Sequence, residues 1–162
     1  DLMPYGQGTR RELLGSRWVD ADAKLAAQLR CQEGEHWLEL DTCRYAIDGG
    51  EPIVHMRVFV RPEAAAMQRE LEGGQAWVFG LIEKYGGERI IEAQQVVSAI
   101  AVPAESARVL GVKARSPGLL VRRFYIGRGD RLLSVSLNVH PVGRFELTTV
   151  WRLEESAGRP AP

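Results

Sequence analysis

The clearest pattern in the chain is an alternation of side-chain character over residues 36–47. In an extended strand it would place every second residue from Leu38 to Arg44 on one face, because successive side chains point to opposite faces. An Asp-Gly-Gly turn follows, so residues 53–60 are predicted to return as the second strand of a hairpin. Further strands are predicted over residues 13–19, 89–102, 119–126, 132–140 and 145–153.

Helical segments separate these strands. Asp20 or Asp22 can cap a helix over residues 23–29, since an Asp side chain accepts hydrogen bonds from the first amides of a helix. Pro62 suits the start of a helix that continues through residues 63–71. Two more helices are predicted over residues 77–85 and 103–110. This order indicates the α+β class, with an antiparallel β-sheet and helices packed on one side of it.

The order of elements repeats within the chain. The helical segment ending at Leu29 resembles the one ending at Leu110, about 80 residues later. A strand, a glycine-containing turn and a second strand follow in both copies, with Tyr45 matching Tyr125. We therefore expect two pseudo-repeated halves in one sheet, and the seam between them is a natural place for a ligand cleft.

Composition narrows the function classes. The 162 residues suggest one domain, and 21 basic against 21 acidic side chains leave no net charge. We do not expect this segment to bind DNA by itself, because nonspecific affinity depends on phosphate neutralisation by basic side chains. No apolar run has the ~20 residues of a membrane span, and no signal peptide opens the chain, so we expect a cytoplasmic protein without a membrane partner.

Metal, cofactor and nucleophile motifs are not found in the sequence. Cys31 and Cys43 form no CxxC pair and are expected to be free thiols. The three histidines have no ligand spacing, and no Ser-His-Asp or Cys-His family signature occurs. We predict no catalytic residue, metal or cofactor. Because the sequence begins at Asp1, we also expect that a segment N-terminal to it is missing.

Four stretches resemble the UTRA domain family in their shared order and spacing. The first reads AQLRCQEGEHWLELDTCRYAIDGGEP, and the last reads VRRFYIGRGDRLLSVSLNVHPVGRF. The four stretches lie at residues 27–52, 79–97, 100–120 and 121–145.

The resemblance extends over residues 13–153, which leaves residues 1–12 as a linker remnant and 154–162 as a tail that we expect to be disordered. It implies a chorismate lyase-like fold and the effector-binding and dimerisation domain of a GntR-family (HutC-type) transcription regulator. A small metabolite would bind here and modulate DNA binding by a missing N-terminal winged helix-turn-helix, in a homodimer. A small lyase-type enzyme of the same fold is the alternative, and a dimerisation module without a ligand is a third possibility.

The resemblance also assigns candidate site residues. Arg44 matches the second of two alternate arginines that bind phosphate in sugar-phosphate-binding relatives, whereas the first position holds Thr42. An arginine in the cleft implies an anionic group on the effector, since its planar fork holds carboxylate or phosphate in a bidentate manner. The threonine makes a standard sugar phosphate a less favoured effector.

Polar residues on the predicted strand 132–140 provide the second set. Ser134, Ser136 and Asn138 share one face, which either faces solvent or forms a pocket wall, and the resemblance favours the pocket wall. Glu92 would need a cationic partner or a ligand, for which Arg44, Arg122 or Arg123 is available. The remaining candidates, each with a structural or solvated alternative, are Arg123, His55, Arg57, Trp77, Thr9 and Arg10.

Overall fold

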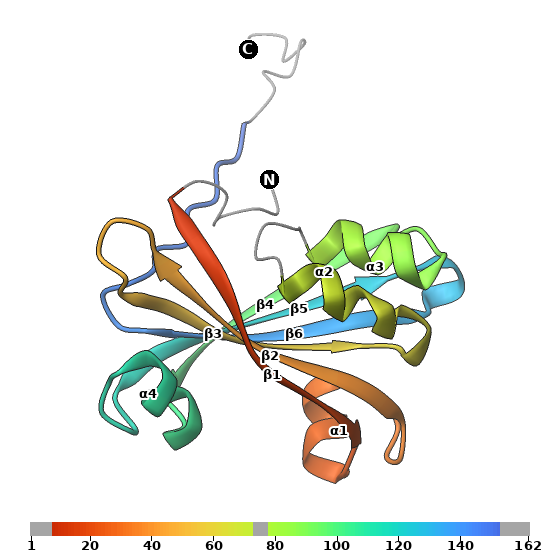
Figure 1. Ribbon diagram of the computed structural model, residues 1–162, viewed down its shortest axis with the longest axis horizontal. Coiled ribbons are helices and arrows are strands. Elements are labelled where there is room, and N and C mark those ends of the chain that lie inside the picture. The colour runs from red at the N-terminus through yellow and green to blue at the C-terminus, as the bar shows by residue number, and fades with distance from the viewer. Residues whose placement is uncertain (1–7, 73–77, 153–162) are drawn as a thin grey trace, which may run out of the picture.

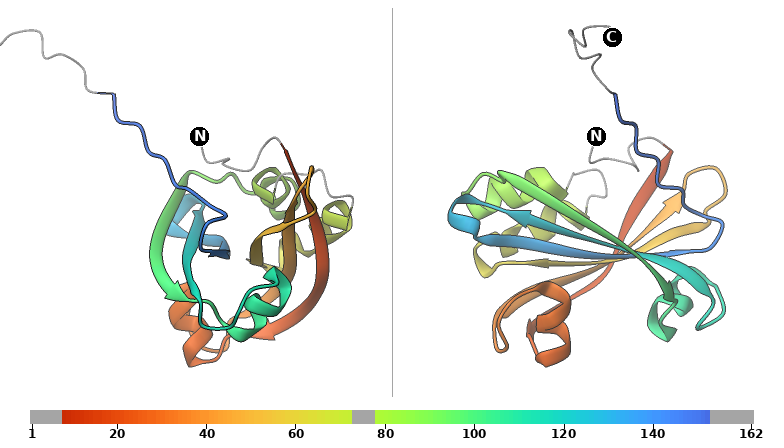
Figure 2. Two further views of the ribbon diagram at one scale, coloured as in Figure 1. Left: turned by 90° about the vertical axis from the view of Figure 1, so that its left-hand side faces the viewer. Right: turned by 180° about the vertical axis from the view of Figure 1, so that it is seen from behind.

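The structure, a computed structural model, describes residues 8–72 and 78–152. Its centre is a six-stranded antiparallel sheet in the order β1-β2-β3-β6-β5-β4, twisted so that the edge strands β1 and β4 cross in projection (Figures 1 and 2). The strands are β1 (Thr9–Asp20), β2 (His36–Ala46), β3 (Pro52–Val60), β4 (Glu92–Ala101), β5 (Pro117–Ile126) and β6 (Leu132–Pro141).

The predicted α+β class, antiparallel sheet and two pseudo-repeated halves are confirmed. Helix α1 (Ala23–Leu29) lies between β1 and β2, and helix α4 (Ala104–Leu110) lies between β4 and β5. Both helices end in a left-handed residue whose amide bonds back into the helix, Arg30 in the first half and Gly111 in the second. Asp22 caps α1 by accepting from the Leu25 amide at 2.8 Å. The halves meet where β3 pairs with β6, at the centre of the sheet.

A helical connector joins the two halves. It comprises the 3-10 helix η1 (Pro62–Met67), α2 (Gln68–Glu72) and α3 (Val78–Gly86). A further 3-10 turn, η2 (Arg128–Asp130), links β5 to β6. Pro62 begins the connector as predicted, but the first six residues wind as a 3-10 helix.

Helices cover both faces of the sheet, whereas we expected them on one side. The connector packs on the face that carries Leu38 and Val60, and this is called the α2–α3 face below. Helix α1 packs on the opposite face against Trp37 and Phe59, and α4 covers the same face, called the α1–α4 face (Figure 1). The reason is that neighbouring residues on the inner strands are apolar, so both faces need cover from water.

Two element boundaries also differ from expectation. Strand β1 begins at Thr9, because residues 9–12 pair with the end of β2. Residues 145–152 form no strand, although a last strand was predicted over 145–153. The preceding strand β6 is already paired with β3 on one edge and β5 on the other, so residues 145–152 cannot form a hairpin with it. The candidate Trp77 and the expected tail at 154–162 lie outside the described residues.

Within residues 8–72 and 78–152, no helix is long and apolar enough to cross a membrane.

A glycine in β5 provides a test of this packing. A Cβ atom at Gly118 would lie 2.5 Å from the carbonyl oxygen of His140 on β6 and 2.8 Å from the Val102 side chain. We expect Gly118→Ala to lower the free energy of unfolding by about 1–3 kcal/mol, because the neighbouring backbone cannot move away. The matched control is Gly80→Ala in α3, where a Cβ meets nothing within 4 Å.

Gly80→Ala should leave stability unchanged or raise it by about 0.5–1 kcal/mol, since alanine is the better helix former. Urea unfolding followed by circular dichroism measures both changes. Equal stability of the two variants would contradict the described approach of β5 to β6.

Candidate functional site

Two arginines lie side by side on the α2–α3 face. Arg11 on β1 and Arg44 on β2 are directly opposite each other in the strand register, and both are buried. The Arg44 Nη1 group donates a hydrogen bond to the Thr9 hydroxyl at 3.1 Å. Burial and then the charge of Arg44 lower the pKa of Arg11 to about 10. Two positive charges are therefore held next to each other in a poorly solvated place.

The second half of the molecule contributes another polar group to the same face. Arg123 on β5 is buried, and its Nε donates to Gln95 Oε1 at 2.8 Å. Ser136 and Asn138 on β6 are also buried, with the Asn138 amide nitrogen donating to Ser136 Oγ at 3.0 Å and to the Val121 carbonyl at 2.8 Å. Among the described residues, nothing donates to the buried Asn138 Oδ1.

The positive charge of Arg123 also affects the pKa of a buried histidine. His140 on β6 stacks on Phe145 with ring centroids 3.9 Å apart. Burial and then the charge of Arg123 lower the pKa of His140 to about 4. The imidazole is thus neutral at pH 7, and the electrostatic environment here disfavours a further positive charge.

Burial excludes the solvent-facing interpretation of the β6 polar residues. Ser134, Ser136 and Asn138 are at most 4% exposed, so this face of the strand does not face solvent. Ser134 donates to the Phe59 carbonyl at 2.7 Å and lies where the connector covers the sheet. Ser136 and Asn138 lie further along the strand. Ser136 is directly opposite Arg123 of β5, and Asn138 is directly opposite Met56 of β3.

The structure separates the other candidates from this group. His55 and Arg57 lie on the α1–α4 face, since they pair with Cys43 and Asp41 of β2. Glu92 also lies on that face, exposed, and accepts a hydrogen bond from Gln94 at 2.6 Å. Arg10 is exposed, pairs with Glu12 at 3.1 Å and stacks over Tyr45. Thr9 is brought to Arg44 by the hydrogen bond already described.

Two members of the group, Arg11 and His140, were not among the predicted site residues, although the alternation of the strand 132–140 places His140 on the face of Ser134, Ser136 and Asn138. The Arg10-Arg11 pair was visible, but only the register of β1 shows that Arg11 lies inside and Arg10 outside. An open groove of about 590 Å³ between β1 and α2 is lined in part by Arg11, Leu13 and Gln68. Where the structure describes the chain, no three His, Cys, Asp or Glu side chains are grouped to hold a metal ion.

Chemically, this arrangement suits an anion. Guanidinium groups at low exposure bind carboxylate or phosphate more strongly than they do in water, because the local dielectric constant is lower. The adjoining amide and hydroxyl groups can hydrogen-bond the uncharged part of a ligand.

Comparison with known proteins gives consistent results. The profile of the UTRA domain family matches residues 5–146. The fold is similar to the ligand-binding domain of a protein described as a GntR-family transcriptional regulator from Bordetella bronchiseptica, with TM-score 0.72, 22% identity, and 91% of each chain covered.

It is also similar to PhnF from Mycobacterium smegmatis, with TM-score 0.73 and 20% identity over 90% of this chain and 64% of that one. For the effector domain of PhnF the TM-score is 0.73 and the identity 21%, over 90% of this chain and 88% of that one. This chain thus spans less than two thirds of the PhnF chain. No curated protein matches it.

The lowered pKa of His140 predicts a pH dependence of stability. The unfolded chain takes up a proton near pH 6.5, whereas the folded chain does so only near pH 4. Protonation therefore favours unfolding, and this residue should cost about 3 kcal/mol of stability as the pH falls from 6.5 to 4. Urea unfolding at pH 7 and pH 4.5, compared between the parent and His140→Gln, measures the contribution. An identical pH dependence in both proteins would exclude it.

Proposed function

Because this chain belongs to the UTRA domain family, we propose that its α2–α3 face binds the small anionic effector of a transcription regulator. Family membership supports an effector-binding domain of the kind found in such regulators. The position of the site and the charge of the effector are inferred from this chain's own residues.

The observation that carries the proposal is the buried pair Arg11 and Arg44 on neighbouring strands. Paired strands lie about 4.8 Å apart, so two guanidinium groups from directly opposite positions can hold the same phosphate or carboxylate. The resemblance implies a phosphate site built from two alternate arginines of one strand, and here Thr42 stands at the first position. Arg11 supplies a second arginine from β1, so Thr42 does not argue against a phosphorylated effector.

The rest of the effector would extend toward the second half of the sheet. Arg123, Ser136 and Asn138 are buried on the same face, and Asn138 keeps an acceptor oxygen available for a hydroxyl or amine. Burial of an acceptor without a donor costs about 1–3 kcal/mol, which a ligand that donates to it would recover. Ligand recognition would then involve both pseudo-repeated halves.

Effector binding at this site would regulate DNA binding if the DNA-competent and DNA-incompetent states of the regulator differ in their affinity for the effector. A ligand shifts an equilibrium only by the difference of its affinities for the two states. We propose that the regulator is a homodimer whose DNA-binding winged helix-turn-helix lies N-terminal to this sequence, and that the domain binds its effector without catalysing a reaction.

Substitution of the arginines tests the proposal with inorganic phosphate as the probe. Arg44→Gln and Arg11→Gln should each weaken phosphate binding by about tenfold or more, because each removes a charge-assisted hydrogen-bond donor. Isothermal titration calorimetry measures the dissociation constant at one fixed, low ionic strength.

The matched control is Arg122→Gln, which removes one positive charge from the opposite face, where Arg122 pairs with Leu137. It should leave phosphate affinity within about twofold of the parent, since the half-buried Arg122 lies on the other side of the sheet from Arg11 and Arg44. Equal loss in all three variants would indicate a general charge effect and contradict a site at Arg11 and Arg44.

A further inference from the structure

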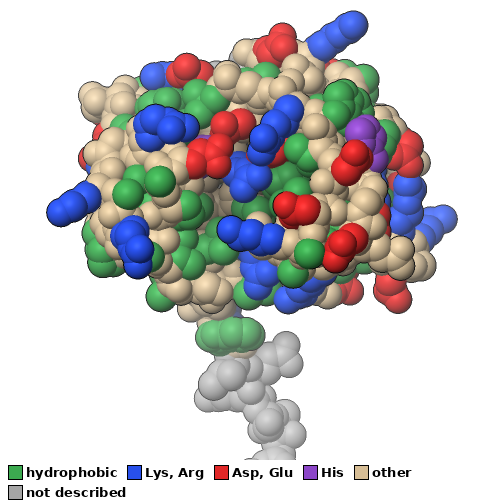
Figure 3. Space-filling view, turned by 90° about the horizontal axis from the view of Figure 1, so that it is seen from below, with side chains coloured by type: hydrophobic (Ala, Val, Ile, Leu, Met, Phe, Trp, Pro, Cys, Tyr) green, Lys and Arg blue, Asp and Glu red, His purple; other side chains and the backbone are tan. Residues whose placement is uncertain are grey.

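The α1–α4 face contains a cleft that the effector site does not use. Figure 3 shows this face, with acidic and basic side chains gathered around a hollow near its centre. One cavity of about 190 Å³ lies between α1 and α4 and is lined by Gln28, Arg57, Ser106 and Leu137, among others. A second, of about 260 Å³, is lined by Arg17, Glu39 and Asp41. Glu105 of α4 lines both, so the two cavities adjoin.

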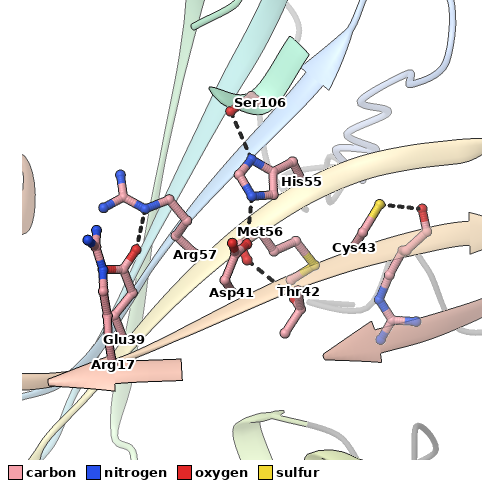
Figure 4. A network of polar contacts seen from close by, with 10 residues as sticks. Arg17, Glu39, Asp41, Thr42, Cys43, His55, Met56, Arg57 and Ser106 are labelled. Carbon is pink, nitrogen blue, oxygen red and sulfur yellow. Dashed lines mark hydrogen bonds and ion pairs between the residues drawn. The ribbon is translucent and has the colours of Figure 1, made fainter. Parts of the chain in front are cut away.

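One end of the cleft carries an excess of positive charge. Glu39 is buried, and its two carboxylate oxygens accept from Arg57 Nε at 2.5 Å and from Arg17 Nε at 2.8 Å (Figure 4). One carboxylate thus neutralises only one of the two guanidinium groups. Within the described chain, Glu39 is the one hydrogen-bond partner of Arg57, so the terminal nitrogens of Arg57 remain available in the cleft.

Next to this trio lies a pair with a negative charge. Asp41 accepts from His55 Nε2 at 2.6 Å, and the other ring nitrogen of His55 lies 2.9 Å from Ser106 Oγ (Figure 4). With Nε2 donating to Asp41, the Ser106 hydroxyl donates to Nδ1. One oxygen of the Asp41 carboxylate is bonded to His55, and the exposed Glu105 adds a second carboxylate at the rim.

The register brings these opposite charges and an apolar wall into one row. Asp41 on β2, Arg57 on β3 and Leu137 on β6 are directly opposite one another on three neighbouring strands. Adjacent positions in such a row are about 5 Å apart. Beyond Leu137 the cleft is apolar, with Val139, Leu120 and Ile100 along its wall.

We propose that this cleft is a second ligand site and that it binds an aliphatic α-amino acid as a zwitterion. The ligand carboxylate would bind the terminal nitrogens of Arg57, and its ammonium group would bind Asp41 and Glu105. Its side chain would lie on Leu137 and Val139. A singly charged ligand would leave one of the two charged ends of the cleft uncompensated, which gives the site its specificity.

The test uses three probes of matched shape: L-leucine, 4-methylpentanoate, which lacks the amine, and 3-methylbutylamine, which lacks the carboxylate. Amide chemical shifts of the whole chain, followed by NMR titration, should move at Arg57, Ser106 and Leu137 with L-leucine. The two singly charged probes should bind at least about tenfold more weakly, since each loses a charge-assisted contact. No shifts with L-leucine, or equal affinity for the three probes, would overturn the proposal.

Two substitutions locate the binding. Arg57→Gln and Glu105→Gln should each weaken L-leucine binding by about five- to tenfold. Glu39 keeps its partner Arg17 in the first variant, and Glu105 is exposed, so both proteins should fold. Glu33→Gln, which removes an exposed carboxylate from the turn after α1, is the matched control and should not change the affinity.

The effector site and this cleft are distinguished by cross-testing. Arg44→Gln should lose phosphate binding and keep L-leucine binding, because its side chain lies on the other face. Arg57→Gln should do the reverse. Loss of L-leucine binding in Arg44→Gln, with an unchanged thermal midpoint, would place the amino acid on the α2–α3 face and overturn the second site.

Discussion

Each inner strand of this sheet is buried on both faces, and the other features of the molecule depend on that constraint. Because side chains alternate, β2 presents Leu38, Thr42 and Arg44 to one layer and Trp37 and Asp41 to the other. A polar residue on such a strand cannot turn to solvent, so it must be hydrogen-bonded or available to a ligand. The two polar groups on opposite faces of the sheet are both consequences of this geometry.

The internal repeat explains why the two faces differ. A pair of similar halves joined at β3 and β6 places α1 and α4 together on one face, on either side of the central strands. Within residues 8–72 and 78–152 the connector between the halves has no counterpart in the second half, and it covers only part of the other face. The α1–α4 face therefore has a cleft between its two related helices. The α2–α3 face has polar strand residues beside the connector.

Much of this fold could be predicted because the pattern within each strand is local. The alternation over residues 36–47 gave the faces of β2 correctly, and the repeat implied the symmetric order of the strands. Pairing register depends on a partner strand elsewhere in the chain. The sequence therefore did not predict that Arg11 lies on the α2–α3 face, or that Glu92 lies exposed on the opposite face. A bulge between Leu13 and Gly15 decides which β1 side chains point inward. The face of His55 depends likewise on the irregular pairing that ends the β2–β3 hairpin.

The electrostatics of the α2–α3 face support the proposed anion site. A fold gains little from placing Arg11 beside Arg44, or Arg123 near a buried His140, since each pair raises the free energy of the charged forms. The lowered pKa values of Arg11 and His140 express this cost. An anion bound between these groups would reverse the sign of the local field and raise both pKa values. A bound anion would stabilise these same charges, so the interaction that lowers the stability of the fold would contribute to the affinity for the proposed effector.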